Sequence, residues 1–330
     1  MKNKKRIFAS LILILIVWLL VIMFLPPERS KDLTVSIPKG SSAGDIGQIL
    51  ADQGVIRSAF GFKLMVRIKR IGSDLKPGAY NFQPNMTLSA VIGKIARGDS
   101  VSKWLSIPEG FTIRQIADRI KEEGFGNSSR FYSLAKFNGE SFQTAFPSPG
   151  RSLEGYLFPD TYLVPIGMTE ADIIREMLDC FNRKVYEPLA DEIRASGMSL
   201  HDIVVTASLI EREARVPEDR PLISAVLRNR LKQNMRLGID ATVLYALRKH
   251  KDRVLYSDLD VDSPYNTYRN FGLPPGPIAN PGVESMKAAI HPADAGFLYY
   301  VAKPDGSHVF TDTFEQHKQA IADIKAKAGR

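Results

Sequence analysis

An uncharged, almost wholly apolar run occupies residues 7–25 near the start of this 330-residue chain. At ~1.5 Å per residue, a helix of this length nearly spans the ~30 Å hydrocarbon core of a bilayer. The basic residues Lys2, Lys4, Lys5 and Arg6 precede the run, and the positive-inside rule places such clusters in the cytoplasm. We therefore expect a cytoplasmic segment at 1–6 and a single-pass anchor in the cytoplasmic (inner) membrane at 7–25. The rest of the chain then lies on the periplasmic, or extracytoplasmic, side.

The residues after the apolar run argue against a cleaved signal peptide. A signal peptide has a shorter apolar region, followed by small residues at its cleavage site. Here the chain continues with Pro26, Pro27, Glu28 and Arg29. An uncleaved anchor is favoured, and residues 26–32 are expected to form a short polar linker.

Charge and cysteine content limit the classes of partner and cofactor. The net charge of +8 and the pI of about 9.4 suit an ordinary basic surface, or attraction to lipid headgroups or an acidic cell-wall polymer. The sequence contains no RNA-binding signature, P-loop or zinc spacing, so we expect no nucleic-acid partner. The single cysteine, Cys180, excludes an intrachain disulfide, and its helical pattern predicts a core residue. His308 and His317 are too isolated to indicate a metal site, and we expect no cofactor.

A weak internal repeat within residues 33–126 predicts small β-α units. Ser-Ile-Pro-Lys-Gly at 36–40 and Ser-Ile-Pro-Glu-Gly at 106–110 each lead into an amphipathic helix, and a looser copy covers 82–98. Each copy is typical of a strand, a turn, a Ser or Thr helix cap, and a helix ending at glycine. These units resemble LysM-like modules, which bind glycan chains. A plain spacer between the membrane and the next domain is the alternative.

The remainder of the chain predicts a mainly helical domain at 153–330, preceded by a boundary loop at 127–152 that is rich in Ser, Gly, Asn and Pro. A segment rich in Pro, Gly, Tyr and Asn at 263–283 is typical of a shaped loop that contacts substrate. A terminal β-hairpin is expected around Pro304-Asp305-Gly306. The fold class is therefore α+β. Apolar periodicity predicts helices at 169–183, 186–196, 200–214, 220–231, 241–247, 285–290 and 314–326.

Two carboxylates, Glu211 and Glu213, end a helical run that is otherwise apolar from Ile203 onward. Burying a charge costs several kcal/mol unless it is paired or neutralised. A carboxyl group in apolar surroundings has a raised pKa, which suits a general acid. On an ideal helix at ~100° per residue, the two side chains lie on opposite flanks of one apolar face, so periodicity does not choose between them. A solvated helix edge is the alternative for both.

Several further motifs follow this helix in a fixed order. They are Asn229-Arg230-Leu231, Met235-Arg236-Leu237, Asp240 to Tyr245, Tyr265-Asn266-Thr267-Tyr268, residues 272–278, Asn280-Pro281-Gly282 and His291-Pro292. Together with residues 207–214 they resemble the endolytic murein transglycosylase family, the MltG or YceG-like proteins. The resemblance covers nearly the whole chain.

The resemblance implies a lytic transglycosylase, a carbon-oxygen lyase that cleaves MurNAc-β-1,4-GlcNAc bonds within peptidoglycan strands. One glutamate protonates the glycosidic oxygen, and the MurNAc 6-hydroxyl then attacks the anomeric carbon to give a 1,6-anhydroMurNAc end. In this reaction the MurNAc 6-hydroxyl takes the place of the second carboxylate, or of its water, in an ordinary glycosidase. The resemblance assigns the acid to Glu213, which a small residue follows, with Glu211 as the alternative. It also implies peptidoglycan as substrate and work beside peptidoglycan synthases, where cleavage ends a growing strand.

Six residues of the later motifs are expected to bind substrate. The two arginines suit a carboxylate, either that of Asp240 or one on the lactyl or peptide groups of the substrate. The aromatic and amide side chains suit stacking on sugars and hydrogen bonding to them, with loop packing as the alternative. The six are Arg230, Arg236, Asp240, Tyr265, Asn266 and Tyr268.

The sequence also fits two other functions. A non-catalytic scaffold that binds glycan and positions cell-wall synthesis enzymes would use the same anchor, repeats and charge. A peptidoglycan hydrolase that uses water needs a second carboxylate across the cleft, and Asp240 is the best candidate.

Overall fold

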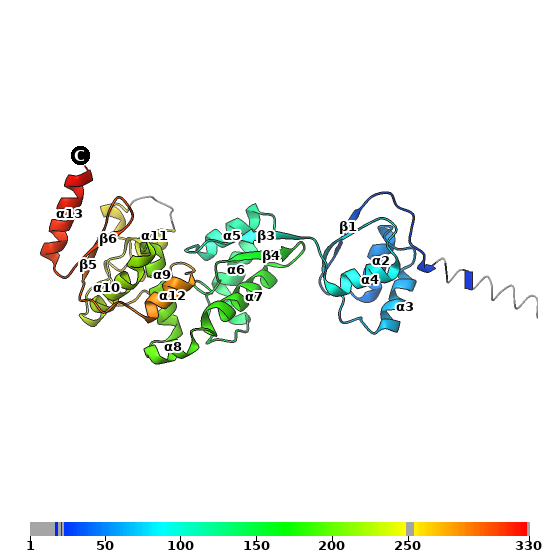
Figure 1. Cartoon of the computed structure of the whole chain (residues 1–330), viewed down its shortest axis with the longest axis horizontal. Helices are drawn as coiled ribbons and strands as arrows, with labels where there is room; N and C mark the ends of the chain where they lie inside the picture. The colour runs from blue at the N-terminus through cyan, green and yellow to red at the C-terminus, as the bar shows by residue number, and fades with distance from the viewer. Residues whose placement is uncertain (1–16, 19–20, 22, 249–253, 329–330) are drawn as a thin grey trace, which may run out of the picture. The chain divides into compact units, whose positions relative to one another are not determined.

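The computed structural model describes residues 17–18, 21, 23–248 and 254–328 (Figure 1). The expected cytoplasmic segment at 1–6, and most of the expected anchor at 7–25, lie outside these residues. Within the described ranges, no helix combines the length and the apolar character that a membrane span requires.

The chain packs into two compact units. Unit 1 contains the chain up to Leu105 together with Tyr162–Thr169, and unit 2 contains Ser106–Thr161 and the chain from Glu170 onward. The expected α+β class is confirmed, because helices combine with small two-stranded sheets in the described chain. The domain boundaries expected from the sequence stay predictions.

Unit 1 begins with a strand, two helices and a second strand that pairs with the first. β1 and β2 are antiparallel, with Val35 opposite Tyr80. Side chains of β1 alternate, so that Val35 and Ile37 enter the core while Thr34 and Ser36 face solvent. Apolar side chains of the helices, among them Phe62, pack against these strand residues and complete the core. The elements are β1 (Leu33–Ile37), α2 (Ala43–Asp52), α3 (Ala59–Lys69), β2 (Gly78–Phe82) and α4 (Leu88–Arg97).

The helix caps of the sequence repeats are present in the structure. Ser42, Thr87 and Thr112 each accept a hydrogen bond from the backbone N–H three residues later, at the start of α2, α4 and α5 (Ile113–Glu122). Gly98, which follows α4, has φ +78, a left-handed conformation that lets the chain leave the helix. The expected strand-turn-helix pattern of the repeat is confirmed.

Helix α6 (Ser128–Phe137) lies in the segment that the composition predicts as a boundary loop. Asn127 caps it by accepting a hydrogen bond from the N–H of Arg130 at 2.9 Å, and Phe131 and Ala135 are buried on one face. The prediction of a loop throughout 127–152 was therefore wrong. Ser and Asn are frequent in loops, but they also start helices, so composition alone does not separate the two.

Helix α9 (Leu200–Glu213) is the central helix of unit 2 (Figure 1). Every residue from Ile203 to Ile210 is buried, so the helix is enclosed on all sides, and it packs against α10, α11 and α12. The surrounding helices are α7 (Glu170–Phe181), a π-helical turn (Asn182–Tyr186), α8 (Ala190–Ser196), α10 (Arg220–Lys232), α11 (Asp240–Leu247) and α12 (Val283–Ile290).

The expected terminal hairpin and closing helix are confirmed. β5 (Tyr299–Ala302) pairs antiparallel with β6 (His308–Thr311), with Tyr300 opposite Phe310. The turn contains Gly306 at φ +89, and α13 (Phe314–Ala328) follows. Two other two-stranded sheets are formed, β1 with β2, and β3 (Ser102–Ser106) with β4 (Thr161–Pro165).

Gly155 offers a sharp test of packing in unit 2. It has φ +89, and a Cβ there would lie 2.6 Å from both Pro277 Cγ and Val204 Cγ1. We expect Gly155→Ala to lower the free energy of unfolding by left-handed strain of about 1–2 kcal/mol plus about 1–3 kcal/mol of overpacking. Gly197→Ala is the matched control, since Gly197 has φ +70 with nothing within 4 Å. Urea unfolding of both variants measures the difference, and equal losses would contradict this account of the packing.

Candidate active site

Glu213 is the last residue of α9, and its side chain is half-buried. Tyr300 of β5 donates its hydroxyl to Glu213 Oε2 at 3.0 Å. Burial raises the pKa of Glu213; the Tyr300 hydrogen bond opposes this, and the negative charge of Asp240 adds to it. In the part of the chain that the structure describes, Oε1 has no hydrogen-bond partner. Glu213 therefore combines a pKa above that of an ordinary glutamate with one carboxyl oxygen that has no hydrogen-bond partner among the described residues.

Tyr300 packs against a buried hydrogen-bonded pair, His308 and Asp219. The backbone N–H and Nδ1 of His308 both lie 2.8 Å from Asp219 Oδ2. The His308 ring meets the Tyr300 ring edge-on, with 5.3 Å between centroids. Burial raises the pKa of Tyr300, so its hydroxyl stays protonated and available as a donor to Glu213.

Glu211 has quite different partners. Its Oε2 accepts hydrogen bonds from the N–H of Gly282 at 3.1 Å and from Ser285 Oγ at 2.7 Å. Arg220 Nε also contacts Ser285 Oγ, at 3.2 Å. Gly282 and Ser285 lie at the N-terminus of α12, where a carboxylate is favoured by the helix dipole. Glu211 thus joins the end of α9 to the start of α12.

A second carboxyl group, Glu109, faces the same helix start. A Cβ on Gly282 would lie 1.9 Å from Glu109 Oε1, so glycine is what allows this carboxylate to approach. Burial raises the pKa of Glu109, and the charge of Glu211 raises it further. Sequence reasoning missed Glu109, which stands in the repeat rather than in the helical domain.

Asp240 and Tyr268, both expected to bind substrate, contact each other. Tyr268 donates its hydroxyl to Asp240 Oδ1 at 2.5 Å, and Asp240 is exposed at the first turn of α11. Burial raises the pKa of Tyr268, as do its hydrogen bond to Asp240 and the charges of Asp240 and Glu213. Because the charges of Asp240 and Glu213 both raise the pKa of Tyr268, the three side chains lie in one region of unit 2.

The two expected arginines differ in their surroundings. Arg230 Nε donates to the carbonyl oxygen of Leu298 at 2.6 Å, and Nη1 donates to that of Leu237 at 2.5 Å. These bonds connect Arg230 of α10 to the residue before the hairpin, and the carboxylate contact expected for it stays a prediction. Arg236 is exposed, with its guanidinium 4.7 Å from the centre of the Phe271 ring.

Asn266 is fully buried, which does not agree with the sugar contact expected for it. Its Nδ2 donates to the carbonyl oxygens of Leu259 and Val261, at 2.8 and 2.9 Å, and its Oδ1 accepts from the N–H of Tyr268 at 3.0 Å. The amide therefore shapes the loop that carries Tyr268. Tyr265 is half-buried, and its ring centre lies 4.9 Å from that of Tyr245.

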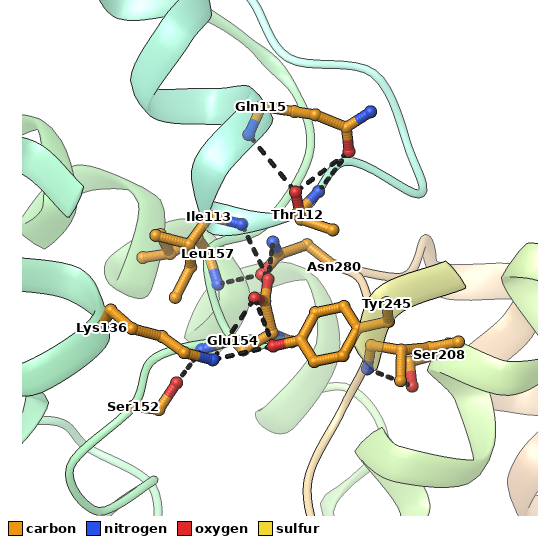
Figure 2. A network of polar contacts seen from close by, with 12 residues as sticks. Thr112, Ile113, Gln115, Lys136, Ser152, Glu154, Leu157, Ser208, Tyr245 and Asn280 are labelled. Carbon is orange, nitrogen blue, oxygen red and sulfur yellow. Dashed lines mark hydrogen bonds and ion pairs between the residues drawn. The ribbon is translucent and has the colours of Figure 1, made fainter. Parts of the chain in front are cut away.

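A buried polar network lies beside this loop (Figure 2). Glu154, only 4% exposed, accepts hydrogen bonds from Tyr245 Oη at 2.9 Å and from the N–H of Ile113 at 2.7 Å. Lys136 Nζ donates to Tyr245 Oη at 2.7 Å and lies 3.8 Å from Glu154 Oε2. Burial raises the pKa of Glu154, and the charge of Lys136 opposes that effect.

Asn280 connects the loop at 263–283 to this network (Figure 2). Its Oδ1 accepts from the N–H groups of Gly155 and Leu157, both at 2.9 Å, and its Nδ2 donates to the carbonyl oxygen of Phe111 at 2.8 Å. The loop is thus fixed just before Gly282, the residue that bonds Glu211.

Sequence reasoning missed Tyr300, His308, Asp219 and Glu154 as site residues. Tyr300 lies 87 residues from Glu213, and no local pattern links them. The sequence does carry a signal for Glu154, since this acidic residue stands at the start of an aromatic-rich stretch. Across the described ranges, no group of three or more His, Cys, Asp or Glu residues is placed to hold a metal ion.

Comparison with known proteins decides the family. The model of the YceG-like family matches residues 35–323, which is most of the chain. The chain belongs to the YceG-like family. The resemblance expected from the motifs of the sequence is confirmed.

Relatives within the YceG-like family include proteins named endolytic murein transglycosylase. The one from Bacillus subtilis (strain 168) is 41% identical over 313 residues, covering 89% of this chain and 86% of that protein. The one from Streptococcus pneumoniae (strain D39) is 31% identical over 326 residues, covering 90% of this chain and 59% of that longer protein.

A crystal structure from the YceG-like family also matches the fold. It is of a YceG-like protein from Listeria monocytogenes, 36% identical, with a TM-score of 0.60. The match covers 88% of this chain and all of the other chain.

Tyr300→Phe tests how the Tyr300 hydrogen bond affects the pKa of Glu213. Removing the hydroxyl takes away a hydrogen bond that favours the charged carboxylate, so the pKa of Glu213 is expected to rise further. Carbon-13 NMR titration of the glutamate side chains measures this pKa, with Glu213→Gln assigning the resonance. Tyr299→Phe is the control, because the Tyr299 ring stacks on His317 instead. An unchanged pKa in Tyr300→Phe would show that the hydrogen bond has no effect.

Proposed function

We propose that this chain is a membrane-anchored endolytic peptidoglycan transglycosylase with Glu213 as its general acid and base. It cleaves MurNAc-β-1,4-GlcNAc bonds within glycan strands and leaves 1,6-anhydroMurNAc ends. One observation carries the proposal: in a chain of the YceG-like family, Glu213 combines a pKa raised by burial with a free carboxyl oxygen. The curated relatives, named endolytic murein transglycosylases, support the reaction class.

The raised pKa of Glu213 suits the first half of the reaction. The protonated carboxyl donates its proton to the glycosidic oxygen as the bond to the anomeric carbon breaks, and the GlcNAc hydroxyl leaves. The carboxylate then takes the proton of the MurNAc 6-hydroxyl while that oxygen bonds to the anomeric carbon. Glu213 ends the cycle protonated, so no water is consumed. The Tyr300 hydroxyl, bonded to Oε2, stabilises the carboxylate between the two steps.

Asp240 and Tyr268 assist electrostatically in this proposal. The negative charge of Asp240 raises the pKa of Glu213, which helps to keep that carboxyl group protonated. The same charge stabilises the positive charge that develops on the sugar ring. Tyr268 holds the Asp240 carboxylate in one orientation through its hydroxyl. Arg236, exposed and stacked on Phe271, is available for the lactyl or peptide carboxylates of the substrate.

The placement of the enzyme in the cell follows from its N-terminal sequence. The apolar run at 7–25, preceded by basic residues, supports a single-pass anchor with the N-terminus inside the cell. Residues 33–126 then contact glycan as LysM-like modules, and 153–330 cleave it. Beside peptidoglycan synthases, such a cleavage ends the elongation of a nascent strand.

Asp240 favours one alternative, a hydrolase that uses water. Asp240 is exposed, and its negative charge raises the pKa of Glu213. A second carboxylate that activates water would have both properties. The two reactions give different ends, because hydrolysis adds a water molecule and the intramolecular attack does not.

Glutamine variants separate the two glutamates. We expect Glu213→Gln to lower cleavage of purified peptidoglycan by about 100-fold or more, because the proton donor is lost. Glu211→Gln keeps an oxygen that accepts from Gly282 and Ser285, so cleavage stays within about tenfold of the parent chain.

Mass spectrometry of the fragments made by the full chain in detergent measures both rate and product. Ends lighter by one water molecule than hydrolysis products are expected. Water-added ends identify the hydrolase, and no fragments from the parent chain identify a glycan-binding scaffold. If Glu211→Gln loses cleavage and Glu213→Gln keeps it, Glu211 is the general acid.

Asp240→Asn tests the electrostatic role of Asp240. Removing its charge lowers the pKa of Glu213, so the fall in kcat/KM on the alkaline side moves to lower pH. Asp191→Asn removes an exposed charge on α8 and serves as the control. The anhydro ends are expected to persist in Asp240→Asn. If only Asp240→Asn loses all cleavage at every pH, Asp240 is itself a required catalytic carboxylate.

A further inference from the structure

Helix α3 of unit 1 presents apolar side chains to solvent. Phe60 is 65% exposed and Ile68 is 69% exposed. At ~100° per residue, Phe60, Leu64 and Ile68 fall within an arc of about 80°. The opposite side of the helix carries Phe62 and Val66, which are buried in the core of unit 1. Single exposed apolar residues are ordinary, but here the exposed Phe60 and Ile68 lie on one side of the helix, with the half-buried Leu64 between them.

Basic residues border the same face of α3. Lys63 and Arg67 are exposed and fall beside Phe60 on the helical projection, and Arg70 follows at the exposed C-cap. No acidic residue occurs in Ala59–Lys69. Large apolar side chains flanked by lysine and arginine are typical of helices that lie in the headgroup region of a membrane. The charge complements acidic phospholipids.

The N-terminal segment meets unit 1 at this helix. A Cβ on Gly61 would lie 3.0 Å from Met23 Cγ, so Met23 packs directly against α3. Arg57 Nε, two residues before the helix, donates to the carbonyl oxygen of Pro26 at 3.1 Å. Phe24 packs on the core of unit 1. Figure 1 shows α3 within unit 1.

From these contacts we infer that the outer face of α3, formed by Phe60, Lys63, Leu64, Arg67 and Ile68, lies on the surface of an anionic lipid bilayer. The inference rests on the proposed anchor at 7–25, which brings the start of α3 close to the membrane. The apolar side chains enter the headgroup region, and the cations bind lipid phosphates. The anchor and α3 together fix the orientation of unit 1 at the membrane, because two separated contacts prevent free rotation about the linker.

An environment-sensitive fluorophore on α3 tests this contact. The full chain carrying Phe60→Cys is labelled with a nitrobenzoxadiazole maleimide, while native Cys180 is buried, which protects a thiol from labelling in the folded chain. Thr34→Cys is the matched control, since Thr34 is exposed on β1, on the face of the sheet away from the core. Both chains are reconstituted into vesicles of phosphatidylcholine, with or without phosphatidylglycerol, and flotation confirms anchoring.

The label at position 60 is expected to shift to the blue in the anionic vesicles and to be quenched by lipids brominated near the headgroup. The label at position 34 stays unchanged. Charge reversal by Lys63→Glu and Arg67→Glu lowers the embedded fraction of the label by about tenfold or more. Circular dichroism of the same variant checks that the charge reversal leaves unit 1 folded.

Other outcomes overturn the inference, each in a distinct way. If the chain floats with vesicles but the two labels behave alike, the anchor holds and the α3 contact is wrong. If the chain does not float, the anchor fails and the inference fails with it, while cleavage in detergent still reports on the active site. A blue shift that is already present in detergent and grows with protein concentration assigns the face to a second copy of the chain.

Discussion

The buried side chain of Asn280 is the contact on which the arrangement of unit 2 most depends. One amide ties together residues 111, 155 and 157, which belong to segments far apart in the sequence. The N–H groups of Gly155 and Leu157 are buried and the carbonyl group of Phe111 is partly buried, so all three need a partner, and a single asparagine offers both a donor and an acceptor. Because Asn280 lies two residues before Gly282, the same contact also sets where α12 begins and where Glu211 is bound. The contact between α12 and Glu211, at the end of α9, therefore depends on it.

Glu213 illustrates a conflict between stability and chemistry. Burial raises its pKa above the unfolded value, so the folded state binds its proton more tightly. That contribution to stability is present at low pH and is lost as the pH rises through the folded pKa. At a pH where the group is charged, the fold holds a carboxylate that water would solvate better, and the Tyr300 hydrogen bond offsets only part of this loss. In the proposed function, Glu213 serves as proton donor at a cost to the stability of the charged fold.

Local sequence patterns predicted most of the secondary structure but not the partners of the site residues. Helix α9, the caps at Ser42 and Thr112 and the terminal hairpin follow from apolar spacing and turn residues, which act over a few positions. Helix α6 was missed because its cap residue also favours loops. The sequence does not predict the burial of Asn266, because an exposed loop amide and a buried one look alike in sequence. The different surroundings of Glu211 and Glu213 come from α12 and β5, which lie 71 to 87 residues further along the chain.

The position of Tyr300 in the chain has a consequence for biosynthesis. Chains are made from the N-terminus, and earlier segments begin to fold while later ones are still being added. Helix α9 is complete long before the hairpin that carries Tyr300, and His308, which packs on Tyr300, comes later still. Until those strands pair, Glu213 lacks its only described side-chain donor. The environment of this carboxyl group is therefore finished among the last events of synthesis, so a partly made chain does not carry the completed site.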